Sequence, residues 1–497
     1  MRYLISIFLI LAGGNFLYCG TDGVLEGKVI NKETHEPLLG VTVMVVGTSI
    51  GAATDIEGNF RISNLDAGTY DVKFSNIGYQ PIVYRVGLKP RITVELIPSF
   101  VELSEVEVMA ERPLIEKDVT STNYSIGQSQ VDRLPIRSVQ EIITLFPSVT
   151  AEGNVRGGKS TEVVYLVDGL PLQDVVGGGV GSSLPKSSIT EFSVQSGGFD
   201  AEYGNALSGV INIITRKGNN RHSLVVRMEK DNWLSGSWYT QHNKATEVEW
   251  TLSGPFLRDK LYYFTANTVQ LNDTRWWQDI NNFFKSPTFR DFSGIGKLDY
   301  NLSSKVHLTA QNVYSVRSWR DYEYSWRFNL DGLPPRERTS LRTTGTISHT
   351  LSNKLHYSFS VSHYYLHSLI GKNKEDIDLT PYQYDFFLQY VVSGNRAWWS
   401  NTKQHIFTAK TDVVYQSNPN NVMKLGFEFN QYDIFSDVVK YEPQKTYFGK
   451  IIPDEPLLNF SSTYHYFPRT GSAYFQDKLE VEKDGAVVNL GFRWDFL

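Results

Sequence analysis

The chain has 497 residues, a formal net charge of −5 and a sequence pI near 6.1, with 41% hydrophobic and 13% aromatic residues. A protein that binds nucleic acid by neutralising phosphates needs a basic excess, so this acidic balance argues against a nucleic-acid partner. Past the N-terminus no apolar run approaches the roughly 18 residues of a membrane helix, which excludes a polytopic helical membrane protein.

Residues 1–20 have the pattern of a secretory signal peptide. Arg2 gives a basic start, and an apolar stretch follows from Tyr3 to Ala12. Cys19 is the only cysteine, so neither an intrachain disulfide nor a cysteine-based zinc site is available. A lipoprotein would need a small residue before that cysteine, and Tyr18 is bulky. We therefore expect ordinary cleavage near residues 19–21, which fits export from the cytoplasm.

Residues 22–97 alternate short apolar segments with turn signals, the pattern of a β-sandwich. The best strands are Val24–Ile30, Thr42–Gly47, Asn59–Ile62, Tyr70–Asn76 and Ile92–Ile97. The string GKVINKETHEPLLGVTVMVVGT and the later TDIEGNFRISNLDAGTYDVKFSNIGYQ resemble the carboxypeptidase-regulatory-like domain, a small transthyretin-like sandwich. No peptidase activity is implied, because the chain has no HExxH motif and no cysteine ligands.

A polar connector, residues 98–118, follows the sandwich. It contains a short alternating segment made of Glu105, Val106, Glu107, Val108 and Met109. An extended strand with free backbone groups is what β-augmentation by another protein's sheet requires. The local pattern fits equally a last strand of the sandwich or an ordinary linker.

Residues 119–218 mix short helices and strands with many glycines. The pattern predicts a helix at Ser138–Leu145 and strands at Val163–Val167 and Val210–Thr215, with Asp168-Gly169 as a turn. The glycine run 177–181 lacks the GxxxxGK[ST] pattern of a phosphate-binding loop, so a plain loop is expected there.

Two strings in this segment, LPIRSVQEIITLFPSVTAEGNVRGGKSTEVVYLVDGLPLQD and ITEFSVQSGGFDAEYGNALSGVINIITRKG, resemble the plug domain of TonB-dependent outer-membrane receptors. The matching positions, in the family's order, are Pro147, Arg156, Gly157, Gly158, Val167, Asp168, Gly169, Gly197, Gly198, Glu202, Tyr203, Gly204, Gly209, Val210, Ile211 and Asn212. The glycines suit tight turns and close packing. We hypothesise that Arg156 and Asp168 form an ion pair that opens when the plug is pulled, although both also suit surface charges beside turns.

The resemblance implies an importer of a scarce, bulky nutrient rather than an enzyme. In that family the plug blocks a barrel, the ligand binds at the outer plug–barrel surface, and TonB, driven through ExbB and ExbD, captures a short segment before the plug. This context favours Glu105–Met109 as the TonB box. It also implies a cleaved signal peptide, an outer-membrane location with the N-terminal domain in the periplasm, and no cofactor.

Residues 219–497 hold 50 of the chain's 66 aromatic residues and all ten tryptophans. Several segments alternate with the two-residue period of a half-buried strand, among them TEVEWTLSG, KLHYSFSVSHYYLH and AVVNLGFRWDF. A soluble sheet and a porin-like barrel share this period. They differ in the polar face, which points outward in a soluble sheet and inward in a porin-like barrel. Strand length and aromatic strand ends favour an antiparallel transmembrane β-barrel in outer-membrane lipid. The string SGPFLRDKLYYFTAN also resembles recurring barrel strands of the same receptor family.

The length creates a conflict, because plugged transporters use about 22 strands and residues 219–497 offer roughly twelve. We therefore expect only the N-terminal part of a barrel, in a fragment of a longer receptor or a truncated reading frame. The predicted fold is mainly β: a transthyretin-like sandwich, a small α+β plug and a partial barrel.

Other functions stay open at this point. No GxSxG, HExxH or nucleotide loop supports an enzyme, and His356, His363 and His367 read as strand residues rather than metal ligands. A non-transporting signalling or adhesion receptor on the same scaffold is the alternative. Tryptophan-rich loops suit packing or stacking on flat ligands. The plug lacks the GKVAGV-like string of the SusC subgroup, which puts a SusD-like lipoprotein partner and a glycan ligand in doubt.

Overall fold

The computed structural model describes residues 23–97, 121–230, 245–445 and 451–497, with short breaks inside these ranges. The breaks are 33, 47, 49, 66–67, 77–78, 80, 88–90, 135, 137–138, 151–153, 274–278, 281, 286, 419, 453–454 and 482–485. The signal peptide, Cys19 and the TonB-box segment Glu105–Met109 lie outside the described residues. The chain divides into two compact units, Met1–Leu114 and Ile115–Leu497.

The first unit is a β-sandwich. One sheet has the order β4-β1-β7 and the other the order β3-β2-β5-β6. The strands are β1 Gly23–Asn31, β2 Thr42–Val45, β3 Gly51–Ala53, β4 Asn59–Leu65, β5 Thr69–Ser75, β6 Ile82–Gly87 and β7 Ile92–Leu96. Alternate residues such as Leu25, Val43 and Phe74 are fully buried between the sheets. All five predicted strands are present, and the pattern missed the short β3 and the edge strand β6.

The second unit begins with the plug. Its five-stranded sheet has the order β10-β9-β12-β11-β8. The elements are β8 Thr122–Gly127, α1 Gln128–Arg133, α2 Val139–Ile143, β9 Val163–Val167, β10 Leu170–Pro171, β11 Ile189–Gly197 and β12 Gly209–Thr215, with 3₁₀ turns at Ser160–Glu162 and Lys186–Ser188. The predicted helix and both predicted strands are therefore present, whereas α1 was missed.

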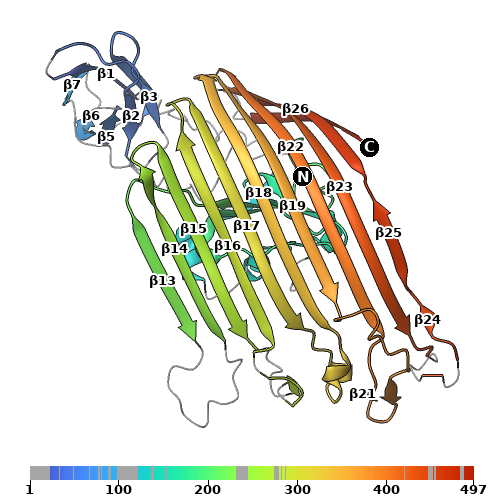
Figure 1. Cartoon of the computed structure of the whole chain (residues 1–497). Coiled ribbons are helices and arrows are strands. Elements are labelled where there is room, and N and C mark those ends of the chain that lie inside the picture. Colours follow the sequence, from blue (N-terminus) through green and yellow to red (C-terminus); the bar gives the residue numbers. More distant parts are fainter. Residues whose placement is uncertain are drawn as a thin grey trace, which may run out of the picture. The chain divides into compact units, whose positions relative to one another are not determined.

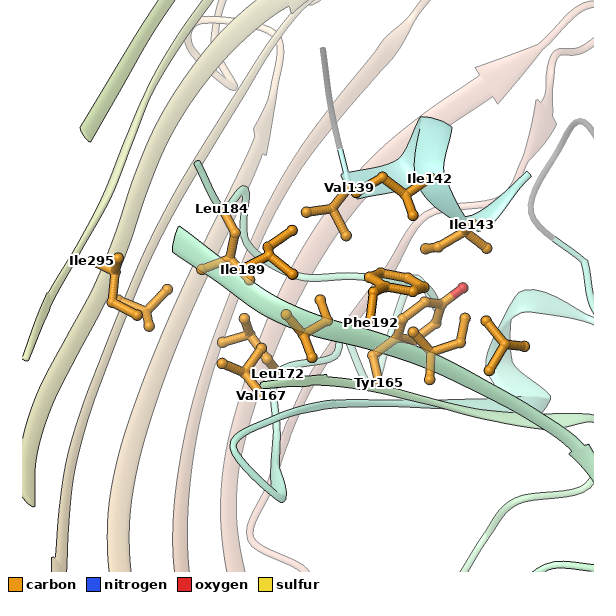
Figure 2. Close-up of a cluster of buried hydrophobic side chains, with 14 of the residues drawn as sticks. Val139, Ile142, Ile143, Tyr165, Val167, Leu172, Leu184, Ile189, Phe192 and Ile295 are labelled. Atoms are coloured by element: carbon orange, nitrogen blue, oxygen red, sulfur yellow. The ribbon is translucent and has the colours of Figure 1, made fainter. Parts of the chain in front are cut away.

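The plug core lies between its sheet and its helices. Figure 2 shows Val139, Ile142 and Ile143 of α2 facing Phe192 of β11. Phe192 stacks on Phe146, with ring centroids 5.4 Å apart. The same buried cluster continues into the following sheet through residues such as Ile295. Among the described residues, no helix is both long and apolar enough to cross a membrane.

The rest of the unit is one large antiparallel sheet, which we call the wall sheet. Its main path runs in chain order from β13 to β27 (Figure 1). The strands are β13 Ser223–Lys230, β14 Thr246–Leu257, β15 Leu261–Asn272, β16 Phe289–Asn301, β17 Val306–Arg320, β18 Pro335–Ser352, β19 Leu355–Ile370, β22 Trp398–Asn418, β23 Asn421–Glu442, β26 Arg469–Val481 and β27 Ala486–Phe496. The short β24 Leu458–Asn459 and β25 Ser462–Tyr466 pair with β23, and β20 Gln383–Asp385 pairs with β21 Tyr390–Ser393 in a separate hairpin.

The two faces of the wall sheet differ as the alternating pattern requires. On β14 the polar residues Glu247 and Glu249 are buried, while Leu252 is exposed. The exposed apolar side chains recur on the outward face of neighbouring strands, as at Phe292, Val316, Leu341, Phe359, Phe407 and Phe427. The polar face therefore lies toward the plug and the apolar face away from it, which is the arrangement of a porin-like barrel and the reverse of a soluble sheet.

The two ends of the wall sheet also differ. At one end, neighbouring strands are joined by tight turns, for example between Leu257 and Leu261 or between Ser352 and Leu355. At the other end the connections are long, such as residues 321–334 and 371–397, and they carry 3₁₀ turns and the β20–β21 hairpin. Figure 1 shows this hairpin beyond the lower ends of the strands. Short turns at one end and long loops at the other are typical of outer-membrane barrels.

Candidate functional site

The plug is held against the polar face of the wall sheet by three clusters of hydrogen bonds, and the first surrounds Asp168. This residue lies in the turn between β9 and β10, with a φ of 51°. Its Oδ1 accepts a hydrogen bond from the backbone N–H of Thr215, at 2.9 Å. Its Oδ2 accepts from Lys297 Nζ at 3.0 Å and from Gln311 Nε2 at 2.6 Å, and both donors belong to the wall sheet. We call these residues the Asp168 cluster.

The electrostatics of the Asp168 cluster favour an ionised carboxylate. Burial alone would raise the pKa of Asp168, but the ammonium of Lys297 and the hydrogen bonds from Thr215 and Gln311 outweigh burial and hold that pKa below its ordinary value. Lys297 is 4% exposed, and Asp168 and Thr215 supply hydrogen-bond partners for its Nζ away from bulk water.

A fully buried arginine extends the same contact to the plug backbone. Arg342 of β18 donates to the carbonyl oxygens of Leu170 and Val167, at 3.0 and 3.2 Å. Its Nη2 also donates to Gln311 Oε1 at 2.8 Å, which fixes the amide that reaches Asp168. The turn between β9 and β10 is therefore bound to three adjacent wall strands, β16, β17 and β18.

The second cluster holds the loop and 3₁₀ turn after β10. Asp174 accepts hydrogen bonds from Arg338 at 3.2 Å and from Gln404 at 2.8 Å, both on the wall sheet. Ser183 donates to Asp291 at 2.7 Å, and Arg317 forms an ion pair with the same carboxylate at 2.6 Å. Nearer the first wall strands, the Ser187 backbone N–H donates to Glu249 at 2.8 Å.

The third cluster holds the segment between β11 and β12. Asp200 accepts a hydrogen bond from Gln476 at 2.8 Å, and the Glu202 carboxylate lies 3.3 Å from Lys424 Nζ. Arg493 of β27 donates to the Glu202 carbonyl oxygen at 2.9 Å. Tyr203 is buried here, and burial together with the neighbouring carboxylates Glu202 and Asp200 raises the pKa of its phenol, which therefore stays protonated.

The structure places most of the predicted plug-motif residues at turns or close packing points. Arg156, Gly157, Asp168, Gly169 and Gly198 have positive φ angles, which supports their assignment to turns. A Cβ at Gly158 would lie 1.8 Å from Ser208 Oγ, and one at Gly204 would lie 2.4 Å from the Arg493 guanidinium. Gly209 packs on Val155 at the start of β12, and Asn212 lies within that strand.

The hypothesis that Arg156 and Asp168 form an ion pair is wrong. The ion pair of Asp168 is with Lys297, a wall residue 129 positions along the chain. The guanidinium of Arg156 lies instead against Gly197, where an added Cβ would come within 2.7 Å of its Nη1. The ion pair therefore joins the plug to the wall sheet, whereas Arg156 packs within the plug.

Two adjoining cavities separate the plug from the later wall strands. They have volumes of about 300 and 320 Å³. Both are lined by Gln173, Val175, Asn205, Tyr432 and Thr470, so they meet along one side of the plug. The plug thus contacts early and later strands of the wall sheet directly, and the cavities lie among its contacts with β22, β23 and β26.

The long connections at one end of the wall sheet pack into a small apolar cluster of their own. Trp326 is 1% exposed and lies against Tyr382, with ring centroids 4.9 Å apart. Arg396 forms a two-bond ion pair with Glu323 over the same indole ring. Trp399, near the start of β22, is also buried, while Trp276 and Trp277 lie outside the described residues.

No group of three or more metal-ligating side chains occurs in the described parts of the chain. The predicted histidines His356, His363 and His367 all lie on β19. His363 and His367 lie on the same outward face of the strand as Phe359. His363 Nε2 contacts His405 Nδ1 at 3.4 Å.

Sequence reasoning missed the wall residues Lys297, Gln311 and Arg342, although a signal was present. In each strand they occupy the polar positions of an alternating pattern, where long hydrogen-bonding side chains recur. The pattern does not say which plug residue each side chain meets.

Family comparisons agree with the order of these parts. A family model described as the CarboxypepD_reg-like domain matches residues 25–108, and the TonB-dependent Receptor Plug Domain model matches residues 116–210. The chain therefore carries a carboxypeptidase-regulatory-like domain followed by a TonB-dependent receptor plug domain.

Curated relatives have names of the same kind. The chain is 27% identical over 364 residues to the TonB-dependent transporter Oar of Myxococcus xanthus, covering 63% of this chain and 34% of that protein. It is 26% identical over 242 residues to the TonB-dependent receptor SusC of Bacteroides thetaiotaomicron, covering 44% of this chain and 24% of that protein. The chain thus spans about a third or less of the length of these relatives.

Solved structures show a similar fold. The outer membrane transporter YddB from Escherichia coli aligns with a TM-score of 0.53 and 13% identity, over 75% of this chain and 56% of that chain. The siderophore receptor PirA from Acinetobacter baumannii aligns with a TM-score of 0.51 and 18% identity, over 76% of this chain and 56% of that chain. The plug and wall sheet together have the fold of TonB-dependent receptors.

Proposed function

We propose that this chain, which carries the carboxypeptidase-regulatory-like and plug domains of TonB-dependent receptors, serves energised import of a nutrient across the outer membrane. The observation that carries the proposal is the plug itself, bound to the polar face of a sheet whose other face is apolar and exposed. An apolar outward face suits lipid, and a folded domain on the inward face suits a gate. The proposed role requires no catalytic group.

The strength of the plug contact suits a gate that opens under force. Each cluster consists of separate hydrogen bonds and ion pairs, for example those of Asp168, Asp174 and Glu202. A typical hydrogen bond contributes only about 0.5–1.5 kcal/mol net, because water replaces the lost partner when the bond opens. The hydrogen bonds and ion pairs therefore together hold the plug firmly. Each of them can still break singly, provided that water enters as the plug moves.

The orientation follows from the two ends of the wall sheet. Outer-membrane barrels have short periplasmic turns and longer extracellular loops. By this rule the loops that contain Trp326 and the β20–β21 hairpin face the outside, and the turn between Leu257 and Leu261 faces the periplasm. The N-terminal domain, after removal of residues 1–20 by signal peptidase, belongs to the periplasm in this proposal.

TonB, energised through ExbB and ExbD, is the proposed partner, and Glu105–Met109 is its proposed docking strand. A second assignment has specific support, because the CarboxypepD_reg-like match extends to residue 108 and so overlaps this segment. The segment then belongs to the sandwich domain, and TonB would need another docking strand.

Co-purification of the full chain in detergent with the periplasmic domain of TonB tests the proposal. We expect the unmodified chain to retain TonB and Val106→Pro to weaken retention at least tenfold, because proline removes a backbone donor from the added strand. Val101→Pro in the same connector is the matched control and should bind normally. Absence of TonB retention by the unmodified chain contradicts energised import. A Val106→Pro chain that binds TonB but has a less stable sandwich assigns the segment to the sandwich instead.

The runner-up is a signalling receptor on the same scaffold, which the additional N-terminal sandwich favours. Signalling without import would retain TonB yet fail to move a ligand into the periplasm. Uptake by whole cells that carry the chain separates these functions.

A further inference from the structure

The sandwich of the first compact unit has a free sheet edge at β7. Its three-stranded sheet has the order β4-β1-β7, and among the described residues no strand pairs with the other side of β7. The Lys32 N–H, just after β1, donates to the Leu96 carbonyl oxygen at 2.9 Å, so the backbone groups of Leu96 face the β1 side. Backbone groups alternate between the two edges of a strand. Those of Thr93 and Glu95 therefore point to the free edge, where a further strand can pair with them.

The inner face of the facing sheet is incompletely covered next to this edge. That sheet has four strands, in the order β3-β2-β5-β6, and β3 contacts β4 at the opposite edge of the sandwich. The three-stranded sheet therefore ends one strand short, opposite β6. Val72 of β5 is fully buried, whereas Tyr84, its cross-strand partner on β6, is 42% exposed, and Ile82 and Val86 on the same face of β6 are only half-buried. Cross-strand partners share a face, so these side chains point toward the place of a fourth strand beside β7.

The connector after β7 contains a segment that fits this place. Glu105–Met109 alternates glutamate with valine, so an extended strand carries Val106 and Val108 on one face and the glutamates on the other. The segment belongs to the same compact unit, Met1–Leu114, and the CarboxypepD_reg-like match continues past β7 to residue 108. The connection, residues 97–104, is shorter than the roughly a dozen residues of a parallel crossover, so the segment would return antiparallel to β7.

We propose that Glu105–Met109 docks in cis on the free edge of β7 as a fourth strand, and that its outer edge stays open to TonB. The TonB part of this inference rests on the proposed import function. In this arrangement Val106 and Val108 cover the inner face of β6, and the glutamates lie on the outer face beside Thr93 and Glu95, which are exposed. Membership of the sandwich and docking of TonB are then compatible, because a strand has two hydrogen-bonding edges.

The two pairings use different backbone groups of the segment. In an antiparallel pair, directly opposite residues either exchange both hydrogen bonds or exchange none. Thr93 and Glu95 have their free groups at the edge, so the outer-face residue Glu107 pairs with β7, whereas the Val106 N–H faces the other edge and TonB. A strand held in this way is already extended, which lowers the entropy that TonB binding costs.

Proline at adjacent positions separates the two pairings in the full chain in detergent. We expect Glu107→Pro to lower the melting temperature of the sandwich by about 4 °C or more in scanning calorimetry, because a hydrogen bond to β7 is lost. Val106→Pro should leave that melting temperature unchanged and weaken retention of TonB instead, since its N–H faces the other edge.

Cysteine cross-linking in a Cys19→Ser background reports the docking directly. Glu95→Cys combined with Glu105→Cys or with Glu107→Cys places both thiols on the outer face of neighbouring strands. At least one of these pairs should form an intrachain disulfide with oxidised glutathione. Glu95→Cys with Val106→Cys is the matched control, because its thiols lie on opposite faces. The cross-linked chain should retain TonB as well as the reduced chain does.

The proposed docking is overturned if neither outer-face pair cross-links more than the control, or if Glu107→Pro leaves the melting temperature of the sandwich unchanged. Loss of TonB retention on cross-linking overturns the open outer edge. A chain that cross-links as expected but never retains TonB contradicts the import function and not the docking in cis. Retention of TonB without cross-linking contradicts the docking alone.

Discussion

Asp168 shows at the scale of one residue how the plug and the wall sheet depend on each other. Its carboxylate accepts hydrogen bonds from plug and wall donors, and its side chain remains ionised because Lys297 and Thr215 stabilise the charge. A buried charge that loses its partners becomes costly, so the two parts of the molecule stabilise each other at this point.

Asp168→Asn should therefore lower the free energy of unfolding by about 1–3 kcal/mol at pH 7, because charge-assisted hydrogen bonds are lost. The pKa of Asp168 is lowered in the folded state, so its contribution is fully present above the unfolded pKa of about 4 and is lost as the pH falls through the folded pKa. Urea unfolding in detergent at pH 7 and at pH 3 should show the difference between the two proteins shrinking at low pH. Asp376→Asn, in an exposed loop, is the control. A difference that does not depend on pH argues against an ionised Asp168.

At the scale of one element, the two faces of β19 lie in different environments along its whole length. Phe359 is 41% exposed on the outward face, and Ser358 beside it belongs to the polar inward face. Successive residues of a strand point to opposite sides, so adjacent positions test the two faces with the backbone unchanged.

Phe359→Arg should destabilise the sheet in lipid vesicles by about 2–4 kcal/mol, because it places a charge against the hydrocarbon. Ser358→Arg, one position away, should change the free energy of unfolding by less than about 1 kcal/mol, because water reaches the inward face near the tight turns. Urea titration in vesicles measures both. If the two variants are equally destabilised, the outward face does not lie in lipid.

At the scale of the whole molecule, the two compact units have separate apolar cores. The sandwich buries residues such as Leu25 among its own strands, and the plug buries residues such as Ile211 against its helices and the wall sheet. Units with separate cores unfold in separate transitions when few contacts join them.

Scanning calorimetry of the full chain should thus show two transitions. Leu25→Ala should lower only the transition of the sandwich, and Ile211→Ala only that of the plug and wall sheet, each by about 2–5 kcal/mol of lost packing. A shift of both transitions by either variant would show that the units are energetically coupled.

The sequence by itself determined the local elements and the types of its first two domains. Apolar residues at alternate positions define β1, β9 and β14 because a strand has a two-residue period, and the plug motifs define the domain. It did not reveal α1 or β6, because short or exposed elements have little apolar periodicity.

Only the tertiary structure decided which face of the wall sheet is inward, because a soluble sheet and a barrel have the same alternation. It also decided the partners. Asp168 meets Lys297 across 129 positions, and Gln173 and Tyr432 come together at one cavity from the plug and from β23. No local pattern encodes such contacts, since strand order, register and the docking of the plug bring distant side chains together.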